Sequence, residues 1–252
     1  MRFILITIVI SVFSLFVQAQ KLSKLGKIAL DELPKAPEFS RIKNGYDYRI
    51  NYKDSLYFQG NELYKLPNAF IANEETADDR PDKINYYNSD GKLVVSIITP
   101  RIINFKVSRH GNLAAFYNQQ NILLINLNNF KIDTLYGSHS FAFTNEEKLI
   151  YYDSKENIIV YNDQVYACDE FPSMFLDFNS EILAITSSRM LRLSGYDFIT
   201  VRNFDGVFFD ARIIDNILYV VEKSVKRKNI FYTLFKTSDL EKFEILEKSD
   251  YQ

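Results

Sequence analysis

Residues 102–137 read IINFKVSRHGNLAAFYNQQNILLINLNNFKIDTLYG, and this stretch decides the fold. Its first part, 102–109, alternates apolar and polar side chains, which is the period-two pattern of a half-buried strand. His110, Gly111 and Asn112 follow as a tight turn, because Gly tolerates a positive φ and Asn comes closest to it. Residues 113–117, 122–127 and 131–136 are three further strand-like runs between polar turns. The stretch therefore predicts four short antiparallel strands.

The same outline recurs three times before the chain ends. The expected strands are 141–144, 149–153, 158–161 and 164–168, then 174–178, 182–186, 190–193 and 198–202, then 207–214, 217–222, 230–235 and 243–247. The last copy is lengthened by an insert at 223–229. One four-stranded sheet cannot bury both faces alone, so it needs neighbours of its own kind. Four-stranded repeats of about 35 to 45 residues indicate a β-propeller.

The first half of the chain supplies further strands at 46–52, 55–58, 62–66, 84–88 and 92–98. Ser89-Asp90-Gly91 is a strong hairpin turn between the last two. Residues 73–83 are the most polar loop. The expected strands number about 22 to 24, which suits five large or six small blades. We predict an all-β propeller of four-stranded antiparallel blades and favour six.

The segment VSRHGNLAAF resembles the strand–turn–strand of TolB-like and WD40-like propeller repeats, where a Ser-Pro-Asp-Gly-type turn precedes a strand of small residues. The resemblance covers roughly residues 84–250. The chain departs from the pattern because it has no Trp, and because the equivalent turns at 145–148, 179–181 and 215–216 lack Gly. The resemblance implies the propeller fold and no particular activity.

Residues 1–19 have the features of a secretory signal peptide. Arg2 supplies a positive charge, residues 3–17 are an apolar run, and Val17-Gln18-Ala19 offers small residues for cleavage. The run is shorter than the roughly 20 residues of a membrane span, although a retained anchor is the alternative. We expect a signal peptide at 1–19, a lead-in segment at 20–43 and the propeller at 44–252. No Asn-x-Ser/Thr acceptor occurs, which favours a bacterial periplasm or exterior.

The composition excludes several function classes. A formal net charge of −2 gives no general attraction for nucleic acid. No hydrolase elbow, Walker loop, dinucleotide fingerprint or zinc motif occurs, so we name no catalytic residue, metal or cofactor. The Asp78–Asp82 cluster lacks the spacing and Gly of a calcium loop and is expected to be a solvated loop. Cys168 is the only Cys, which suits a buried inert thiol, with an intermolecular bridge as the alternative.

Charged residues are expected to gather by face. In a propeller, loops between the second and third strands share a face with the connections between blades. Candidate binding residues on that face are Arg101, His139, Arg189, Lys226, Arg227 and Lys228. The opposite turns collect Glu146, Glu147, Glu181 and Asp215. A cationic rim favours an anionic small molecule, a glycan or an acidic protein, whereas the simpler interpretation is an ordinary solvated edge.

Two functions follow from these observations. The first is an exported propeller that acts as a binding or protein-interaction module, with the bacterial envelope as its expected location. The alternative is a hydrolase or lyase acting on glycans or peptides at the channel mouth, with His139 and a carboxylate such as Asp205 as its acid–base pair. Fold alone does not choose between them.

Overall fold

The computed structural model describes residues 41–43, 49–52, 56–60, 62–74, 81–226 and 229–251. These residues form strands, turns and loops and contain no helix, and so none that could cross a membrane. The predicted signal peptide, most of the lead-in segment, Arg227 and Lys228 lie outside them. The all-β prediction is confirmed.

The first sheet has five strands in the order β1-β4-β5-β6-β7. Its members are β1 (Arg41–Lys43), β4 (Glu62–Lys65), β5 (Ala69–Glu74), β6 (Asp82–Asn88) and β7 (Leu93–Thr99). A separate antiparallel hairpin consists of β2 (Arg49–Tyr52) and β3 (Leu56–Gln59). Strand β5 was not expected from the sequence, and all six of its residues are buried.

Each of the other four sheets has four antiparallel strands in chain order. The second contains β8 (Asn104–Val107), β9 (Leu113–Tyr117), β10 (Ile122–Asn126) and β11 (Ile132–Leu135). The third contains β12 (Phe141–Phe143), β13 (Leu149–Asp153), β14 (Ile158–Tyr161) and β15 (Gln164–Ala167). The fourth contains β16 (Pro172–Phe178), β17 (Glu181–Thr186), β18 (Arg189–Ser194) and β19 (Asp197–Asn203). The last contains β20 (Val207–Ile214), β21 (Ile217–Lys226), β22 (Asn229–Thr237) and β23 (Glu244–Tyr251).

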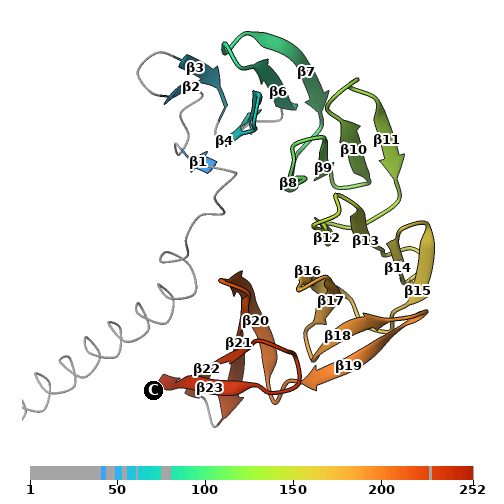
Figure 1. The fold of residues 1–252 in the computed structure, drawn as a ribbon, viewed down its shortest axis with the longest axis vertical. Helices are drawn as coiled ribbons and strands as arrows, with labels where there is room; N and C mark the ends of the chain where they lie inside the picture. Colours follow the sequence, from blue (N-terminus) through green and yellow to red (C-terminus); the bar gives the residue numbers. More distant parts are fainter. Residues whose placement is uncertain are drawn as a thin grey trace, which may run out of the picture.

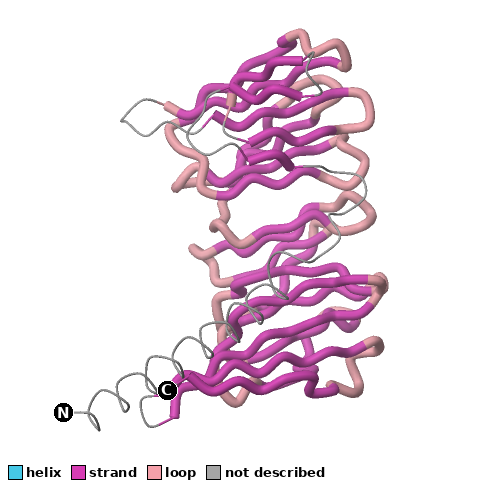
Figure 2. Tube along the Cα trace, turned by 90° about the vertical axis from the view of Figure 1, so that its left-hand side faces the viewer, coloured by secondary structure: helices cyan, strands magenta, loops and turns pink. Residues whose placement is uncertain are grey.

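The sheets follow one another around an arc, with the first strand of each repeat toward its inside (Figure 1). Turned by 90°, the arc is a stack of sheets whose turns collect along two sides (Figure 2). The described part of the ring is open between the last sheet and the first. The fold is therefore a propeller of about five blades, so the count favoured from the sequence, six, gives way to the alternative of five.

The core lies between neighbouring sheets. The second strand of the second sheet, β9, is buried on both faces, as Ala114, Ala115 and Phe116 show with 0% exposure. Small residues here let the sheets approach, and the larger side chains of the neighbouring sheet fill the space. Ile71 of the first sheet packs with Phe116 of the second in one such cluster. The inner sheets thus bury their faces against their neighbours.

The tight turns have the expected backbone even where Gly is missing. Gly111 has a φ of +74°, and its N–H donates to Ser108 O at 3.0 Å. In the corresponding turn of the third sheet, Glu147 has a φ of +61°, and Asn179 has +52° in the fourth. Asn is among the residues that enter this region most readily, whereas Glu enters it at a cost. The Glu147 carboxylate accepts hydrogen bonds from the second sheet, and these explain why a Glu occupies this position.

Two local expectations are wrong. Residues 223–226 of the expected insert at 223–229 instead continue β21, whose pairing with β22 runs to Lys226 opposite Asn229. Asp82 is not part of a solvated loop, because it begins β6, is 3% exposed and accepts a hydrogen bond from the Ile102 N–H at 2.7 Å. This carboxylate joins the first sheet to the connection that leads into the second.

Candidate functional site

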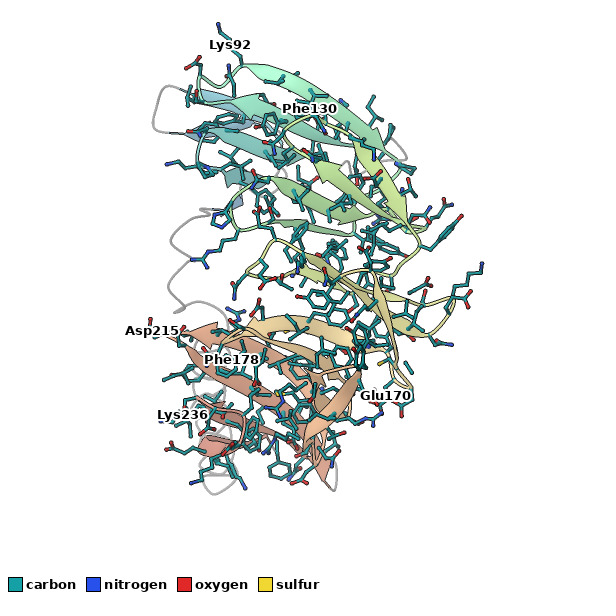
Figure 3. The ribbon with its side chains drawn as sticks, turned by 45° about the vertical axis from the view of Figure 1, so that its right-hand side comes forward. Lys92, Phe130, Glu170, Phe178, Asp215 and Lys236 are labelled. Atoms are coloured by element: carbon teal, nitrogen blue, oxygen red, sulfur yellow. The ribbon has the colours of Figure 1, made fainter. Side chains whose placement is uncertain are left out.

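The strand order gives the propeller two faces. The connections between sheets and the loops between second and third strands form one face, which we call the loop face. It includes residues 100–103, 118–121, 136–140, 154–157, 168–171, 187–188 and 204–206. The remaining turns form the turn face. Glu170 of the loop face and Asp215 of the turn face lie on opposite sides of the molecule (Figure 3).

Aromatic rings gather on the loop face where the second, third and fourth sheets meet. The His139 ring lies 5.2 Å from the Phe171 ring and 6.2 Å from the Tyr117 ring, measured between centroids. The buried Tyr152 ring meets Phe171 edge-on at 5.2 Å. Asn104 Nδ2 donates to the His139 carbonyl at 2.7 Å, which fixes the loop. Phe171 is nevertheless 39% exposed, so this ring is both held in place and accessible.

A further exposed aromatic residue lies close to His139 in the sequence. Tyr136, in the same connection as His139, is 70% exposed. The ammonium group of Lys155 lies 5.8 Å from the Tyr136 ring centroid, which is a cation–π distance. Lys155 comes from the β13–β14 loop of the third sheet, and Tyr136 follows the second. The loop face therefore offers a cation next to an exposed ring.

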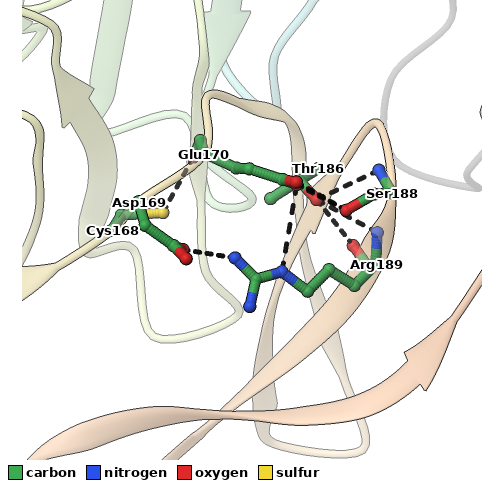
Figure 4. A network of polar contacts seen from close by, with 6 residues as sticks. All are labelled: Cys168, Asp169, Glu170, Thr186, Ser188 and Arg189. Carbon is green, nitrogen blue, oxygen red and sulfur yellow. Dashed lines mark hydrogen bonds and ion pairs between the residues drawn. The ribbon is translucent and has the colours of Figure 1, made fainter.

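The connection between the third and fourth sheets carries a polar network (Figure 4). The Arg189 guanidinium pairs with Asp169, and Arg189 Nε lies 3.9 Å from Glu170 Oε2. Ser188 Oγ is 2.6 and 2.8 Å from the two oxygens of Glu170. Hydrogen bonds from Ser188 and Thr186, with the Arg189 charge, lower the pKa of Glu170, while burial opposes them. Glu170 therefore stays ionised and holds this connection against the β17–β18 turn.

Cys168 precedes this network and is 7% exposed. Burial raises the pKa of its thiol, which disfavours the reactive thiolate. Its Sγ lies 2.9 Å from the Glu170 carbonyl oxygen. The thiol thus packs as a structural group, in agreement with the inert assignment.

The predicted binding residues have different surroundings. Arg101 is exposed between β7 and β8, and His139 is exposed between β11 and β12. Arg189 lies at the start of β18, where Asp169 and Glu170 compensate its charge, so it adds little to a cationic rim. Lys226 ends β21, while Arg227 and Lys228 fall outside the described residues.

Sequence reasoning missed Phe171, Tyr136 and Tyr117 as members of a site. Only the placement of Phe171 in a connection between repeats distinguished it from core aromatics, because Tyr136 belongs to the expected strand 131–136. Within the described residues no group of three or more His, Cys, Asp or Glu side chains could hold a metal ion. Over the same residues, no hydrogen bond or ion pair joins the His139 ring to a carboxylate.

No family model matches this sequence, and no curated protein matches it. Solved structures do. A functionally unknown protein from Desulfotomaculum acetoxidans has a TM-score of 0.53 at 9% identity, over 84% of this chain and 79% of that one. A putative 6-phosphogluconolactonase from Bacteroides fragilis has a TM-score of 0.51 at 10% identity, over 86% and 83%. At such identities the likeness concerns the fold alone, and it supports the propeller.

Proposed function

We propose that this chain is an exported propeller that binds a partner protein through its loop face. The observation that carries the proposal is Phe171, which is 39% exposed although His139 and Tyr152 hold its ring from two sides. An aromatic side chain fixed before binding loses little conformational entropy when a partner covers it. Such residues are typical anchors of protein interfaces.

Two exposed cations of the loop face, which stand among the carboxylates Glu156, Asp169 and Asp205, offer pairing sites for acidic groups of a partner. Arg101 is exposed, and Lys155 lies over the exposed Tyr136 ring. The compensated Arg189 is left out of the binding set, and its role is to hold Asp169 and Glu170. An anionic glycan fits the same residue types, because exposed aromatic rings also stack on sugars. Of the two, a protein is the favoured partner, because an exposed ring held in place before binding, such as Phe171, is typical of protein interfaces.

Export and a bacterial envelope location belong to this proposal and rest on the signal-like residues 1–19. We expect the exported chain to begin at Gln20, which mass spectrometry of the periplasmic or secreted fraction would measure. An intact Met1 in a membrane fraction would instead make the segment an anchor. We do not propose the hydrolase or lyase alternative, because it lacks a positioned carboxylate for His139 among the described residues.

Affinity capture from native envelope extract tests the binding face. The bait is the mature chain, and the variant combines Phe171→Ala with His139→Ala. The control is Tyr196→Ser, which changes an 89% exposed ring in the β18–β19 turn on the turn face. We expect quantitative mass spectrometry to find partners retained by the wild type and the control and lost by the variant. Equal capture by all three baits would reject the loop face as the binding surface.

A further inference from the structure

The last sheet has one packed face and one bare face. Leu218 and Val220 of β21 pack with Phe178 and Leu183 of the fourth sheet. Side chains alternate along a strand, so Tyr219, Val221, Lys223 and Val225 point the other way. The register aligns these four with Lys236, Leu234, Tyr232 and Ile230 of β22. This second face borders the opening of the arc (Figure 1).

The bare face is apolar and partly accessible. Val207, Phe209 and Val225 are 53%, 51% and 65% exposed. Val207 stands opposite Lys223, and Phe209, at a β-bulge, meets the Tyr232 ring edge-on at 5.3 Å. All three therefore lie on the same face around the buried pair Val221 and Leu234. Contiguous exposed apolar residues of this kind mark interaction surfaces.

The charges on this face are mostly compensated. Arg212 Nε lies 3.2 Å from Asp210 Oδ2, and Lys236 Nζ lies 3.0 Å from Glu244 Oε2. Lys223, between Val207 and Tyr232 in the register, makes no ion pair with any described residue. The face thus has an apolar and aromatic centre and one uncompensated cation.

We propose that this bare face is a docking surface for a partner protein segment that alternates apolar and acidic side chains. The apolar side chains would cover Phe209 and Val225, and a carboxylate would pair with Lys223. A second copy of this chain is the poorer occupant. In a two-fold pair the same patch meets itself, so two uncompensated Lys223 ammonium groups would share one interface. The surface adjoins the loop face at Val207 but shares no residue with it, so each proposal can fail without the other.

Fluorescence anisotropy with the mature chain tests the proposal. The probe is a labelled peptide of about ten residues that alternates Val and Glu, the length of a long strand. Its matched control alternates Val and Lys. We expect saturable binding of the acidic peptide only. Val225→Glu and Phe209→Glu should each weaken that binding about tenfold or more, because they place a charge in the contact. Lys223→Glu should shift the preference toward the basic peptide.

The control variant is Tyr196→Glu, which adds the same charge at an exposed ring on the turn face. It should bind like the wild type, and Val225→Glu and Tyr196→Glu should keep the wild-type melting temperature because these side chains are 65% and 89% exposed. Equal binding of both peptides, or unchanged binding by Val225→Glu and Phe209→Glu, would overturn the proposal. A dimer that Val225→Glu dissociates would assign the face to a second copy. Binding that tightens about tenfold or more on deletion of residues 20–40 would assign it to the chain's own N-terminal segment.

Discussion

The first and last sheets of the arc are similar, but the outer face of the first is covered and that of the last is exposed. On the first sheet, Phe70 and Tyr87 face the β2–β3 hairpin, whose Phe58 ring lies 4.7 and 5.0 Å from theirs. Phe58 is 1% exposed. On the last sheet, Phe209 contacts Tyr232 at 5.3 Å but remains 51% exposed. The same kind of ring is core at one end and surface at the other.

The difference shows that the repeats alone do not cover the outer faces of the two end sheets. Inner sheets cover one another, and each end sheet keeps one face that no repeat covers. At the first sheet a two-stranded hairpin, too small to be a blade, supplies the missing cover. Among the described residues the last sheet has no equivalent. We therefore expect mutations at the first end to affect stability and those at the last end to affect binding.

Phe58→Ala should have the largest effect on stability. It removes a fully buried ring from the cluster that joins the hairpin to the first sheet. Such a change costs about 3–5 kcal/mol, through lost burial and the cavity left behind. Urea unfolding followed by circular dichroism would measure it. A loss below about 1 kcal/mol would mean that the hairpin does not cover this face in solution.

Gly111→Val tests the joint between the covered sheet and its neighbour. Gly111 has a φ of +74°, and a Cβ built there would lie 3.3 Å from Leu66 Cδ2 of the first sheet. A β-branched residue is strained at this φ, so we expect a loss of about 1–3 kcal/mol. The melting temperature should fall accordingly. Gly195→Val is the matched comparison, because Gly195 has a φ of +64° but no neighbouring atom within 4 Å. An equal loss in both variants would assign the cost to backbone strain alone.

Glu147→Gln tests a joint between inner sheets. Glu147 Oε1 accepts hydrogen bonds from Ser108 Oγ and the His110 N–H, and Oε2 accepts one from Asn112 Nδ2, all at 2.7 Å. Burial would raise the pKa of Glu147, but these three hydrogen bonds outweigh it and lower the pKa. This tie between the second and third sheets gives a reason for a positive φ at a Glu. We expect a loss of about 1 kcal/mol at neutral pH.

The pH dependence of this loss has a definite sign. A carboxylate with a lowered pKa in the folded state contributes stability above its unfolded pKa, near 4.5. The contribution disappears as the pH falls through the folded value. The difference in unfolding free energy between wild type and Glu147→Gln should therefore be full near pH 7 and shrink below about pH 4.5. A difference that does not change with pH would contradict the charge-assisted tie.

The sequence predicted the repeats because each strand carries its own alternation and each turn its own polar residues. It did not predict β5, Ala69–Glu74, because the polar end of this strand merges with the stretch 73–83, whose polar composition predicts a loop. It favoured six blades over the alternative of five because a hairpin and a blade begin with the same local signals. It listed Arg189 as a binding cation because its partner Asp169 is twenty positions away in sequence. Pairings of this kind arise only when strands assemble, so the network in Figure 4 had no sequence signal.

Phe209→Ala should have the smallest effect on stability, and it closes the comparison with Phe58→Ala. The ring is 51% exposed, so truncation loses only part of its burial together with one edge-on contact to Tyr232. An aromatic pair of this kind is worth about 0.5–1.5 kcal/mol beyond burial, and exposed sites usually fall within about 0.5 kcal/mol, so we expect a loss of about 1 kcal/mol or less. The same urea unfolding experiment measures both variants. A loss as large as that of Phe58→Ala would mean that the last sheet is covered in the free protein, and the bare face would then be core. A small loss with weakened binding of the acidic peptide would instead separate the two ends by role, one built for stability and the other for contact.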